Sequence, residues 1–266
     1  MARNSNWSEE EVTLALVLYL SLPFASISAR NPKVVEFANL IGRTPGAVSF
    51  KLGNLGHCDA SLQARGINGL SNISKVDRAV WERYIGNGRG AQSVAPLVSD
   101  AEKIAVDRNL DLAFLLGTGP ESQPQAAAAE ERLVHQKVRV SQQFFRTMIL
   151  AGYGNRCAVS GLKSATLVEA AHIIPWAEDE SLRLQPANGI ALNSLLHRAY
   201  DCFLIGIDGE RRVHVSRELR VGAEDSRLQS FFESINGAAL QLSRHFTPSP
   251  ELLERRFAQY RERISF

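Results

Sequence analysis

Residues 169–201, EAAHIIPWAEDESLRLQPANGIALNSLLHRAYD, decide the fold of the C-terminal part of this chain. The apolar residues at the start of this stretch predict a short strand that ends at His172, followed by a polar stretch and a turn at Asn188. The segment NGIALNSLLHRAYDCF, residues 188–203, has helical spacing and places His197 on a helix. Histidine, asparagine and histidine therefore fall on a strand end, a loop and a helix.

The segments around these residues sharpen the pattern. QQFFR (142–146) and CAVSG (157–161) come before it, and LIGID (204–208) comes after it. In this order the segments resemble the HNH (ββα-metal) endonucleases, in the branch found among bacterial restriction-type nucleases. The resemblance covers about residues 135–225. It implies a ββα-metal nuclease domain. Together with the helical N-terminal domain that the sequence pattern predicts, this gives an expected α+β protein.

The resemblance implies a role for each of the three residues. His172 would be the general base that activates water, and an unperturbed imidazole has a pKa near neutral pH, which suits that task. Asn188 would brace the loop and orient that imidazole, while His197 would bind one divalent metal ion. Mg²⁺ or Mn²⁺ suits phosphate chemistry, and a histidine ligand is also compatible with Ni²⁺, Co²⁺ or Zn²⁺.

The second protein ligand to the metal is left open. Many HNH enzymes carry an acidic residue directly before the first histidine, where this chain has Ala171. Asp201 is favoured because it lies four residues after His197 and so on the same helix face. Asn188 and Glu169 are the alternatives. The other role for Asp201 is an ion pair with a nearby arginine that braces the helix.

Many HNH proteins also carry two C-x-x-C pairs that bind a structural zinc, and this chain departs from that pattern. The corresponding positions hold Cys157, Ser160, Asn193 and Leu196, so only one thiolate remains and no structural zinc is expected. We expect apolar packing to hold the motif instead. The residues expected to pack there are Val159, Leu167, Ile190, Leu192, Leu195 and Phe203.

The N-terminal unit, residues 1–85, is predicted to be helical. Ser8 and Glu11 form a capping box at the start of an apolar helix that ends before Pro23. This run is shorter than the roughly 20 apolar residues that a bilayer span needs, so we expect a core helix and no membrane anchor.

Two short helices follow, each opened by an N-cap residue and a proline, Asn31-Pro32 and Thr44-Pro45. Gly42 and Gly56 are expected to end them. A tight turn between two short amphipathic helices is the layout of a helix-turn-helix, although an ordinary helical hairpin has the same local signals. The residues expected to face DNA are Arg43, Ser49, Lys51 and Asn54.

Three arginines in the C-terminal part are candidate phosphate contacts because a guanidinium group matches the geometry of phosphate oxygens. They are Arg139 and Arg146, before CAVSG, and Arg198, next to His197. Each is alternatively a solvated surface charge.

Composition supports this organisation and excludes several classes of protein. The 266 residues carry 30 Lys and Arg against 28 Asp and Glu, a net charge of +2, so overall charge does not indicate a nucleic-acid partner. Three scattered cysteines exclude a disulfide framework and favour a reduced, cytoplasmic protein. We predict a helical DNA-recognition domain over 1–85, a linker with one helix over 86–130, and a nuclease domain with C-terminal helices over 131–266.

These features together predict a metal-dependent endonuclease that cuts double-stranded DNA and restricts foreign DNA, with base-modified DNA among its potential targets. A homodimer is compatible with cutting two strands when each chain has one active site. Two alternatives remain: a DNA-binding regulator that retains an inactive HNH fold, and a nonspecific nuclease whose N-terminal unit is an interaction module.

Overall fold

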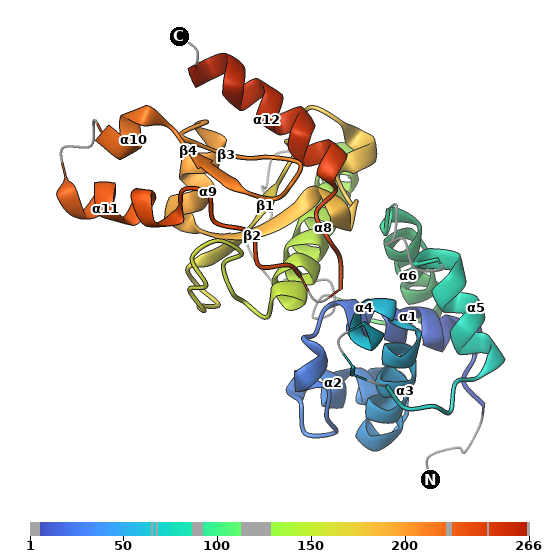
Figure 1. Cartoon of the computed structure of the whole chain (residues 1–266). Helices are drawn as coiled ribbons and strands as arrows, with labels where there is room; N and C mark the ends of the chain where they lie inside the picture. The colour runs from blue at the N-terminus through green and yellow to red at the C-terminus, as the bar shows by residue number, and fades with distance from the viewer. Residues whose placement is uncertain are drawn as a thin grey trace.

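The computed structural model describes residues 6–64, 66–67, 69–86, 93–112, 129–221, 225–243 and 245–264 (Figure 1). Its helices are α1 (Glu9–Leu20), α2 (Pro32–Leu40), α3 (Pro45–Cys58), α4 (Ala60–Gln63), α5 (Lys75–Tyr84), α6 (Ala95–Arg108), α8 (Ala129–Tyr153), α9 (Ser194–Asp201), α10 (Arg217–Val221), α11 (Ser226–Ile235) and α12 (Pro250–Ile264). Its strands form two antiparallel pairs, β1 (Val168–His172) with β2 (Gly189–Asn193) and β3 (Ile205–Ile207) with β4 (Val213–Val215). This mixture of helices and small sheets is compatible with the predicted α+β class.

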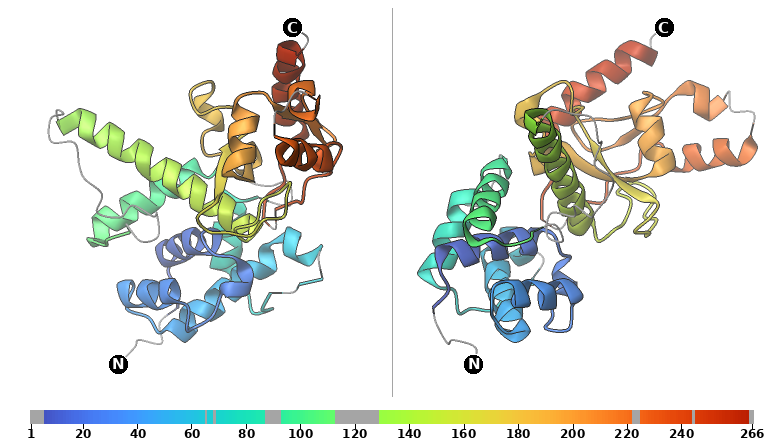
Figure 2. Two further views of the ribbon diagram at one scale, coloured as in Figure 1. Left: turned by 90° about the vertical axis from the view of Figure 1, so that its left-hand side faces the viewer. Right: turned by 180° about the vertical axis from the view of Figure 1, so that it is seen from behind.

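Helix α1 lies inside the helical N-terminal half. Every residue from Val12 to Leu20 is buried, and α3, α5 and α6 pack around the helix (Figure 2). A helix that is apolar on all sides needs this all-round cover. The predicted capping box is confirmed, since Ser8 Oγ accepts a hydrogen bond from the Glu11 N–H and the Glu11 carboxylate accepts one from the Ser8 N–H.

The predicted start signals of the next two helices are also confirmed. Asn31 and Thr44 accept hydrogen bonds from first-turn N–H groups of α2 and α3. Gly42 follows α2 with φ of +69°, a conformation that glycine adopts without steric cost. The predicted end of the second helix at Gly56 is wrong. Helix α3 continues past it, and glycine is required there for space because a Cβ would lie 2.3 Å from Phe24 Cε2.

The strand pair β1–β2 lies against α8 and α9. The predicted helix over 188–203 is wrong in its first half, because Gly189–Asn193 forms β2 and α9 begins only at Ser194. All five residues of β2 are buried. A strand covered on both faces has a continuous apolar run, which periodicity alone does not distinguish from a buried helix.

The predicted hairpin around Asp208-Gly209 is confirmed as β3 and β4. Helix α12 packs on β3, where Gly206 provides the space: a Cβ there would lie 2.6 Å from the Tyr260 ring. The two predicted C-terminal helices correspond to α11 and α12.

Among the contacts that join the helical half to the strand-bearing half are packing of α1 against α8 and two sets of hydrogen bonds. The Val94 N–H donates to the Leu184 carbonyl at 3.0 Å, which attaches the start of α6 to the loop after β1. Asp59 Oδ2 accepts a hydrogen bond from Tyr19 Oη at 2.9 Å and lies 2.9 Å from His245 Nδ1, and all three side chains are buried. Most of the predicted Gly/Pro/Gln/Ala linker lies outside the described residues.

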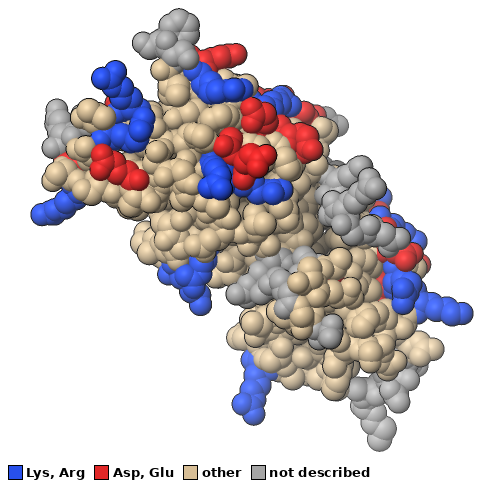
Figure 3. Space-filling view, viewed as in Figure 1, with Lys and Arg blue, Asp and Glu red and all other residues tan. Residues whose placement is uncertain are grey.

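Charged side chains of both signs are interspersed over the C-terminal half on the face drawn in Figure 3. This mixture is consistent with the net charge of +2. Among the described helices, none combines the length and the apolar character that crossing a membrane requires.

Candidate active site

The structure places His172 and Asn188 at the two ends of the loop between β1 and β2, and His197 on the helix that follows. His172 ends β1 opposite Gly189, the first residue of β2. Asn193 ends β2 and caps α9, since its Oδ1 accepts a hydrogen bond from a first-turn N–H. The cap fixes where the strand becomes a helix, and therefore where the His197 side chain leaves α9.

The His172 imidazole is held on three sides. It stacks on the Phe145 ring from α8, with ring centroids 3.9 Å apart and planes 10° apart, and Trp176 meets it edge-on at 5.6 Å. His172 Nε2 lies 3.2 Å from the carbonyl oxygen of Arg183. A carbonyl oxygen only accepts, so Nε2 carries the proton and Nδ1 keeps its lone pair. The contact thus selects the tautomer that leaves Nδ1 as a base.

Electrostatics also favour the neutral imidazole. Burial lowers the pKa of His172, the Arg183 carbonyl raises it, and positive charge on His197 lowers it further. The net direction is downward from the ordinary value. Neutral imidazole is therefore the main form of His172 at neutral pH.

Asn188 is fully buried and uses its amide on both sides of the loop. Its Oδ1 accepts a hydrogen bond from the Ile174 N–H at 2.8 Å, and its Nδ2 donates to the carbonyls of Ile174 at 3.0 Å and Leu182 at 3.1 Å. Ile174 follows His172 closely, and Leu182 precedes the Arg183 carbonyl. Asn188 therefore braces both backbone segments that hold the His172 ring.

His197 lies between two carboxylates. Its Nδ1 is 2.6 Å from Glu169 Oε2 and its Nε2 is 3.5 Å from Asp201 Oδ2. The hydrogen bond from His197 lowers the pKa of Glu169 against an opposing effect of burial, and the Ser194 hydroxyl adds a second hydrogen bond to the same carboxylate. Glu169 thus orients the ring, while Nε2 points toward Asp201.

This donor set fits a divalent metal ion. Metal-binding histidines typically donate their second N–H to a carboxylate, as Nδ1 of His197 does to Glu169. The lone pair of Nε2 and the Asp201 carboxylate then face the same point, where a cation relieves the repulsion between two acceptors. Within the described residues no group of three or more His, Cys, Asp or Glu side chains is arranged to hold a metal. Two protein ligands leave the other positions to water and substrate phosphate, which is how Mg²⁺ usually binds.

Residues 157–208 match the family model for HNH endonucleases. We refer to these residues as the HNH segment. They contain β1, β2 and α9, and with them the three residues of the predicted His-Asn-His set. HNH proteins act on nucleic acids and generally use a divalent metal ion, so the match indicates nuclease activity and a nucleic-acid substrate. No curated protein matches the chain.

The four positions that correspond to zinc ligands lie together in the HNH segment and are linked by hydrogen bonds. The Ser160 N–H contacts Cys157 Sγ at 3.4 Å, Asn193 Nδ2 donates to Ser160 Oγ at 3.0 Å, and the Leu196 N–H donates to Asn193 Oδ1 at 2.9 Å. These contacts join the turn after α8 to the start of α9. We call this set the Cys157–Leu196 chain.

The prediction that six apolar residues pack the HNH segment is wrong for two of them, which are exposed. Leu167 is 55% exposed and Leu195 is 49% exposed. Leu167 lies just before β1, and Leu195 lies on the outer face of α9 beside exposed Arg198. Four of the six expected core residues lie at least partly in the interior: Val159, Ile190, Leu192 and Phe203.

The candidate phosphate contacts of the C-terminal half differ in their surroundings. Arg198 is exposed on α9 next to His197. Arg146 on α8 is half-buried, with Nη2 3.5 Å from the Val168 carbonyl, and its charge contributes to the lowered pKa of Glu169. The side chain of Arg139 lies outside the described residues. Arg198 is thus the predicted contact that is both exposed and beside the metal-ligand candidates.

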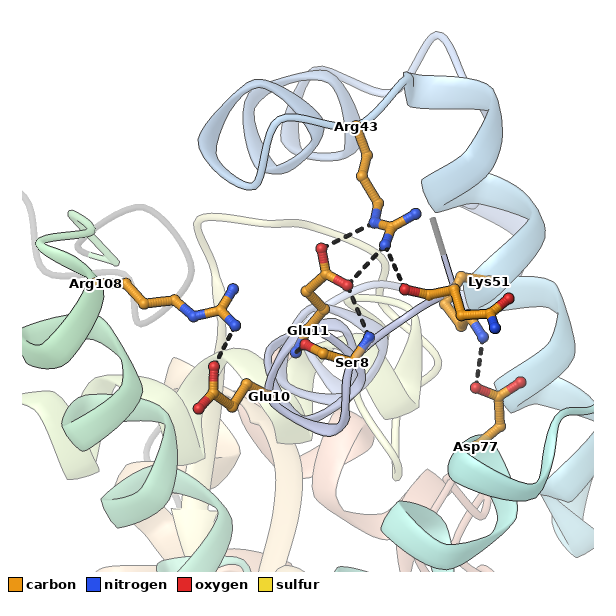
Figure 4. Close-up of polar contacts among 8 residues, drawn as sticks. Ser8, Glu10, Glu11, Arg43, Lys51, Asp77 and Arg108 are labelled. Carbon is orange, nitrogen blue, oxygen red and sulfur yellow. Dashed lines mark hydrogen bonds and ion pairs between the residues drawn. The ribbon is translucent and has the colours of Figure 1, made fainter. Parts of the chain in front are cut away.

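The expectation that Arg43 and Lys51 project outward toward DNA is wrong. Arg43 binds Glu11 through two nitrogens at 2.7 and 3.0 Å (Figure 4). Its guanidinium lies 4.4 Å from the Trp7 ring centroid. Lys51 is 5% exposed and forms a 2.5 Å ion pair with Asp77. Both cations complete the interior of the helical half, so the negative charges of Glu11 and Asp77 are already matched there.

The other two predicted DNA-facing residues, Ser49 and Asn54 on α3, are half-buried. Between them Phe50 is 66% exposed, although its neighbours on the buried face of α3 are fully covered. The outer face of α3 therefore carries the apolar Phe50 and the polar Ser49 and Asn54. The two cations that the sequence pattern placed there, Arg43 and Lys51, point elsewhere.

Sequence reasoning missed two groups that hold His172. Phe145 was used only as part of the flanking segment QQFFR, and its contact with the imidazole was not predicted. The Arg183 carbonyl has no sequence signal, because every residue carries one. Glu169 was one of three alternatives for a metal ligand, and its contact with His197 Nδ1 indicates an orienting role instead. A carboxylate on the strand that ends at the first histidine was the available signal.

Proposed function

We propose that the chain is a metal-dependent endonuclease that hydrolyses DNA phosphodiester bonds, with His172 as general base and His197 as metal ligand. One observation carries the proposal: a neutral imidazole with a free Nδ1 lies within electrostatic range of the Glu169–His197–Asp201 row. A buried base and a cation-binding pair on adjoining elements are the two parts that this hydrolysis needs.

Each residue has a distinct task in this reaction. His172 Nδ1 takes the proton from the water that attacks phosphorus, while the Arg183 carbonyl holds Nε2–H in place. Asn188 keeps the loop closed around that geometry. Glu169 fixes the His197 ring so that Nε2 faces Asp201. His197 and Asp201 would hold a divalent ion, which when bound would supply positive charge for the scissile phosphate and the leaving oxygen.

We also propose that the HNH segment folds without a structural zinc. The Cys157–Leu196 chain of hydrogen bonds links the same four positions that two C-x-x-C pairs would occupy. Only Cys157 among them carries a thiol, and Cys157 is fully buried.

For the N-terminal half we propose a role in positioning DNA for restriction, through the Ser49–Asn54 face of α3. A second role is favoured by a specific observation: Phe50 is exposed on that face while Arg43 and Lys51 are paired internally, which suits a protein-interaction module. Asn54→Ala and Phe50→Ser separate the two roles. Altered cut sites with Asn54→Ala support the DNA reader, whereas loss of self-association with Phe50→Ser supports the interaction module.

The nuclease proposal is tested with supercoiled plasmid and each of Mg²⁺, Mn²⁺, Ni²⁺, Co²⁺ and Zn²⁺. We expect wild-type protein to nick or linearise the plasmid, and folded His172→Ala and His197→Ala to lose that activity. A folded wild-type protein that cuts nothing with any metal contradicts the proposal and leaves a DNA-binding regulator with an inactive HNH fold. Unmodified, methylated and hydroxymethylated DNA, compared in parallel, test the restriction role.

A further inference from the structure

Helix α12 and the end of α9 enclose a second charged site. A cavity of about 310 Å³ is lined by Glu178, Phe203, Arg256, Gln259, Glu262 and Arg263. The Arg256 guanidinium lies 3.9 Å from the Phe203 ring centroid, and the Arg263 guanidinium lies 4.6 Å from it. Residues seven apart on a helix share a face. The two cations therefore reach the cavity from the same face of α12 and contact one aromatic ring.

Arg256 is a buried cation without a matching carboxylate. It is 6% exposed, its Nε is buried with no hydrogen-bond partner in the described part of the chain, and its Nη1 donates to the neutral amide of Gln259. The rings of Phe203 and Tyr200 offset only part of that charge. A buried charge is costly unless it is paired and hydrogen-bonded. The cavity thus has an unmet requirement for an anion.

The carboxylates at this cavity do not remove that requirement. Glu178 lies 4.0 Å from Arg255, and Asp179 lies 3.8 Å from the same guanidinium, so both carboxylates pair with Arg255 and not with Arg256. Glu262, the other carboxylate of the lining, is exposed on α12 and forms no ion pair with Arg256 or Arg263 in the described part of the chain.

The backbone conformation of Phe203 fixes the position of its ring. Its φ is +59°, a left-handed conformation that few residues other than glycine adopt. The conformation turns the chain just after Asp201, at the end of α9, and places the ring between Arg256 and Arg263. Glu178 comes from the loop that follows His172. The segments that follow β1 and α9 therefore both contribute to the cavity.

We propose that this cavity binds a backbone phosphate of the nucleic-acid strand, next to the phosphate that is cut. The proposal rests on the proposed function for the identity of its ligand. Guanidinium groups bind phosphate oxygens through paired N–H donors, and two guanidinium groups line this cavity, Arg256 and the exposed Arg263. Arg256 and Arg263 are positioning residues: they hold the strand in register while the chemistry takes place at His172.

The test measures DNA binding without cleavage, in the His172→Ala background with chelator present. The affinity for a short labelled duplex is determined over a series of salt concentrations, because each lost phosphate contact reduces the slope of log K against log salt by about 1. We expect this reduction for Arg263→Gln and for Arg256→Gln. Arg261→Gln is the matched control, since Arg261 lies on another face of α12 and binds Glu254; its slope should equal that of the parent.

Two further measurements keep the outcome decisive. If Arg256→Gln does not fold, the exposed Arg263→Gln alone decides, and an unchanged slope for it overturns the proposal. Inorganic phosphate at matched ionic strength distinguishes a free anion from a strand: thermal stabilisation by phosphate together with unchanged duplex slopes also overturns it. Because no cleavage is measured, a wild-type protein that fails to nick plasmid counts against the proposed function and not against this site.

Discussion

Asn188 and Ile174 form a two-point hydrogen bond across the loop that carries the candidate base. The Ile174 N–H donates to Asn188 Oδ1 at 2.8 Å and Asn188 Nδ2 donates back to the Ile174 carbonyl at 3.0 Å. The same Nδ2 donates to Leu182, next to the carbonyl that binds His172. The buried amide of Asn188 therefore holds both the backbone that follows His172 and the backbone next to the Arg183 carbonyl, which selects the tautomer of His172. Its contribution to activity is indirect and acts through His172.

Replacing Asn188 with aspartate should lower both the stability and the nicking rate, although the two side chains are nearly the same size. The carboxylate keeps the acceptor for the Ile174 N–H but donates to neither carbonyl, and each buried group left unpaired costs about 1–3 kcal/mol. A displacement of about 1 Å at the base can reduce the rate about 10²-fold. Urea unfolding and nicking rates measure the two effects. Asn236→Ala is the control: it loses a hydrogen bond to the Val215 N–H far from His172, so a similar rate loss there would contradict a specific role.

The nicking rate should depend on pH through His172. Since burial lowers the pKa of His172 and the neutral form is the base, the rate should rise with pH, and the midpoint of this rise should lie below the ordinary histidine value of about 6.5. Phe145→Leu removes the stacked ring and part of the burial, so the pKa should move upward and the acidic limb should shift to higher pH. Rate profiles of the two proteins at saturating metal test this, and an unshifted limb would show that another group titrates.

Local signals in the sequence predicted the helical half well. The capping box of Ser8 and Glu11, the prolines after Asn31 and Thr44, and Gly42 act within a few residues, so the order of residues along the chain predicts their effects. The sequence did not predict the direction in which the Arg43 and Lys51 side chains point. Their partners lie 32 and 26 residues away in sequence, and only the packed fold brings those carboxylates to them.

At the candidate site the spacing of His172, Asn188 and His197 predicted the element that carries each residue, apart from β2, which was assigned to a helix. The groups that hold these side chains were beyond that pattern. Phe145 belongs to α8 and meets His172 only after the sheet packs on that helix, and Glu169 becomes a partner of His197 only through the β1–α9 contact. Such partners depend on tertiary packing and not on periodicity.

Gly189→Ala should destabilise the protein and impair the base together. A Cβ at Gly189 would lie 2.4 Å from Ile149 Cδ1 and 2.8 Å from Phe145 Cζ, the ring on which His172 stacks. Such overpacking typically costs about 1–3 kcal/mol. Chemical unfolding and nicking assays should both show a loss. Adding Ile149→Val removes the nearest clashing atom, so the double variant should recover part of the stability and part of the nicking activity. A double variant that is no more stable and no more active than Gly189→Ala would contradict this account.

Glu169→Gln should weaken metal binding without unfolding the protein. Glutamine retains an acceptor for His197 Nδ1–H but loses the charge that makes the ring a better ligand, and outer partners of this kind typically contribute about 10- to 100-fold to metal affinity. Mn²⁺ titration by calorimetry and the metal dependence of nicking should shift together. Glu233→Gln, at an exposed position of α11, is the matched control and should change neither the affinity for Mn²⁺ nor the metal dependence of nicking. Full activity of Glu169→Gln at limiting Mn²⁺ would exclude the orienting role.

The Cys157–Leu196 chain predicts that the fold needs no structural zinc. The experiment uses His197→Ala, so that the catalytic ion makes no contribution to stability. Dialysis against a zinc-selective chelator should leave its thermal midpoint unchanged, because hydrogen bonds through Ser160 and Asn193 already join the four positions. Adding Ser160→Ala, which removes the acceptor for Asn193 Nδ2, should lower stability by about 1 kcal/mol. A midpoint that falls on chelation and returns when Zn²⁺ is added would show that the thiol of Cys157 holds a metal after all.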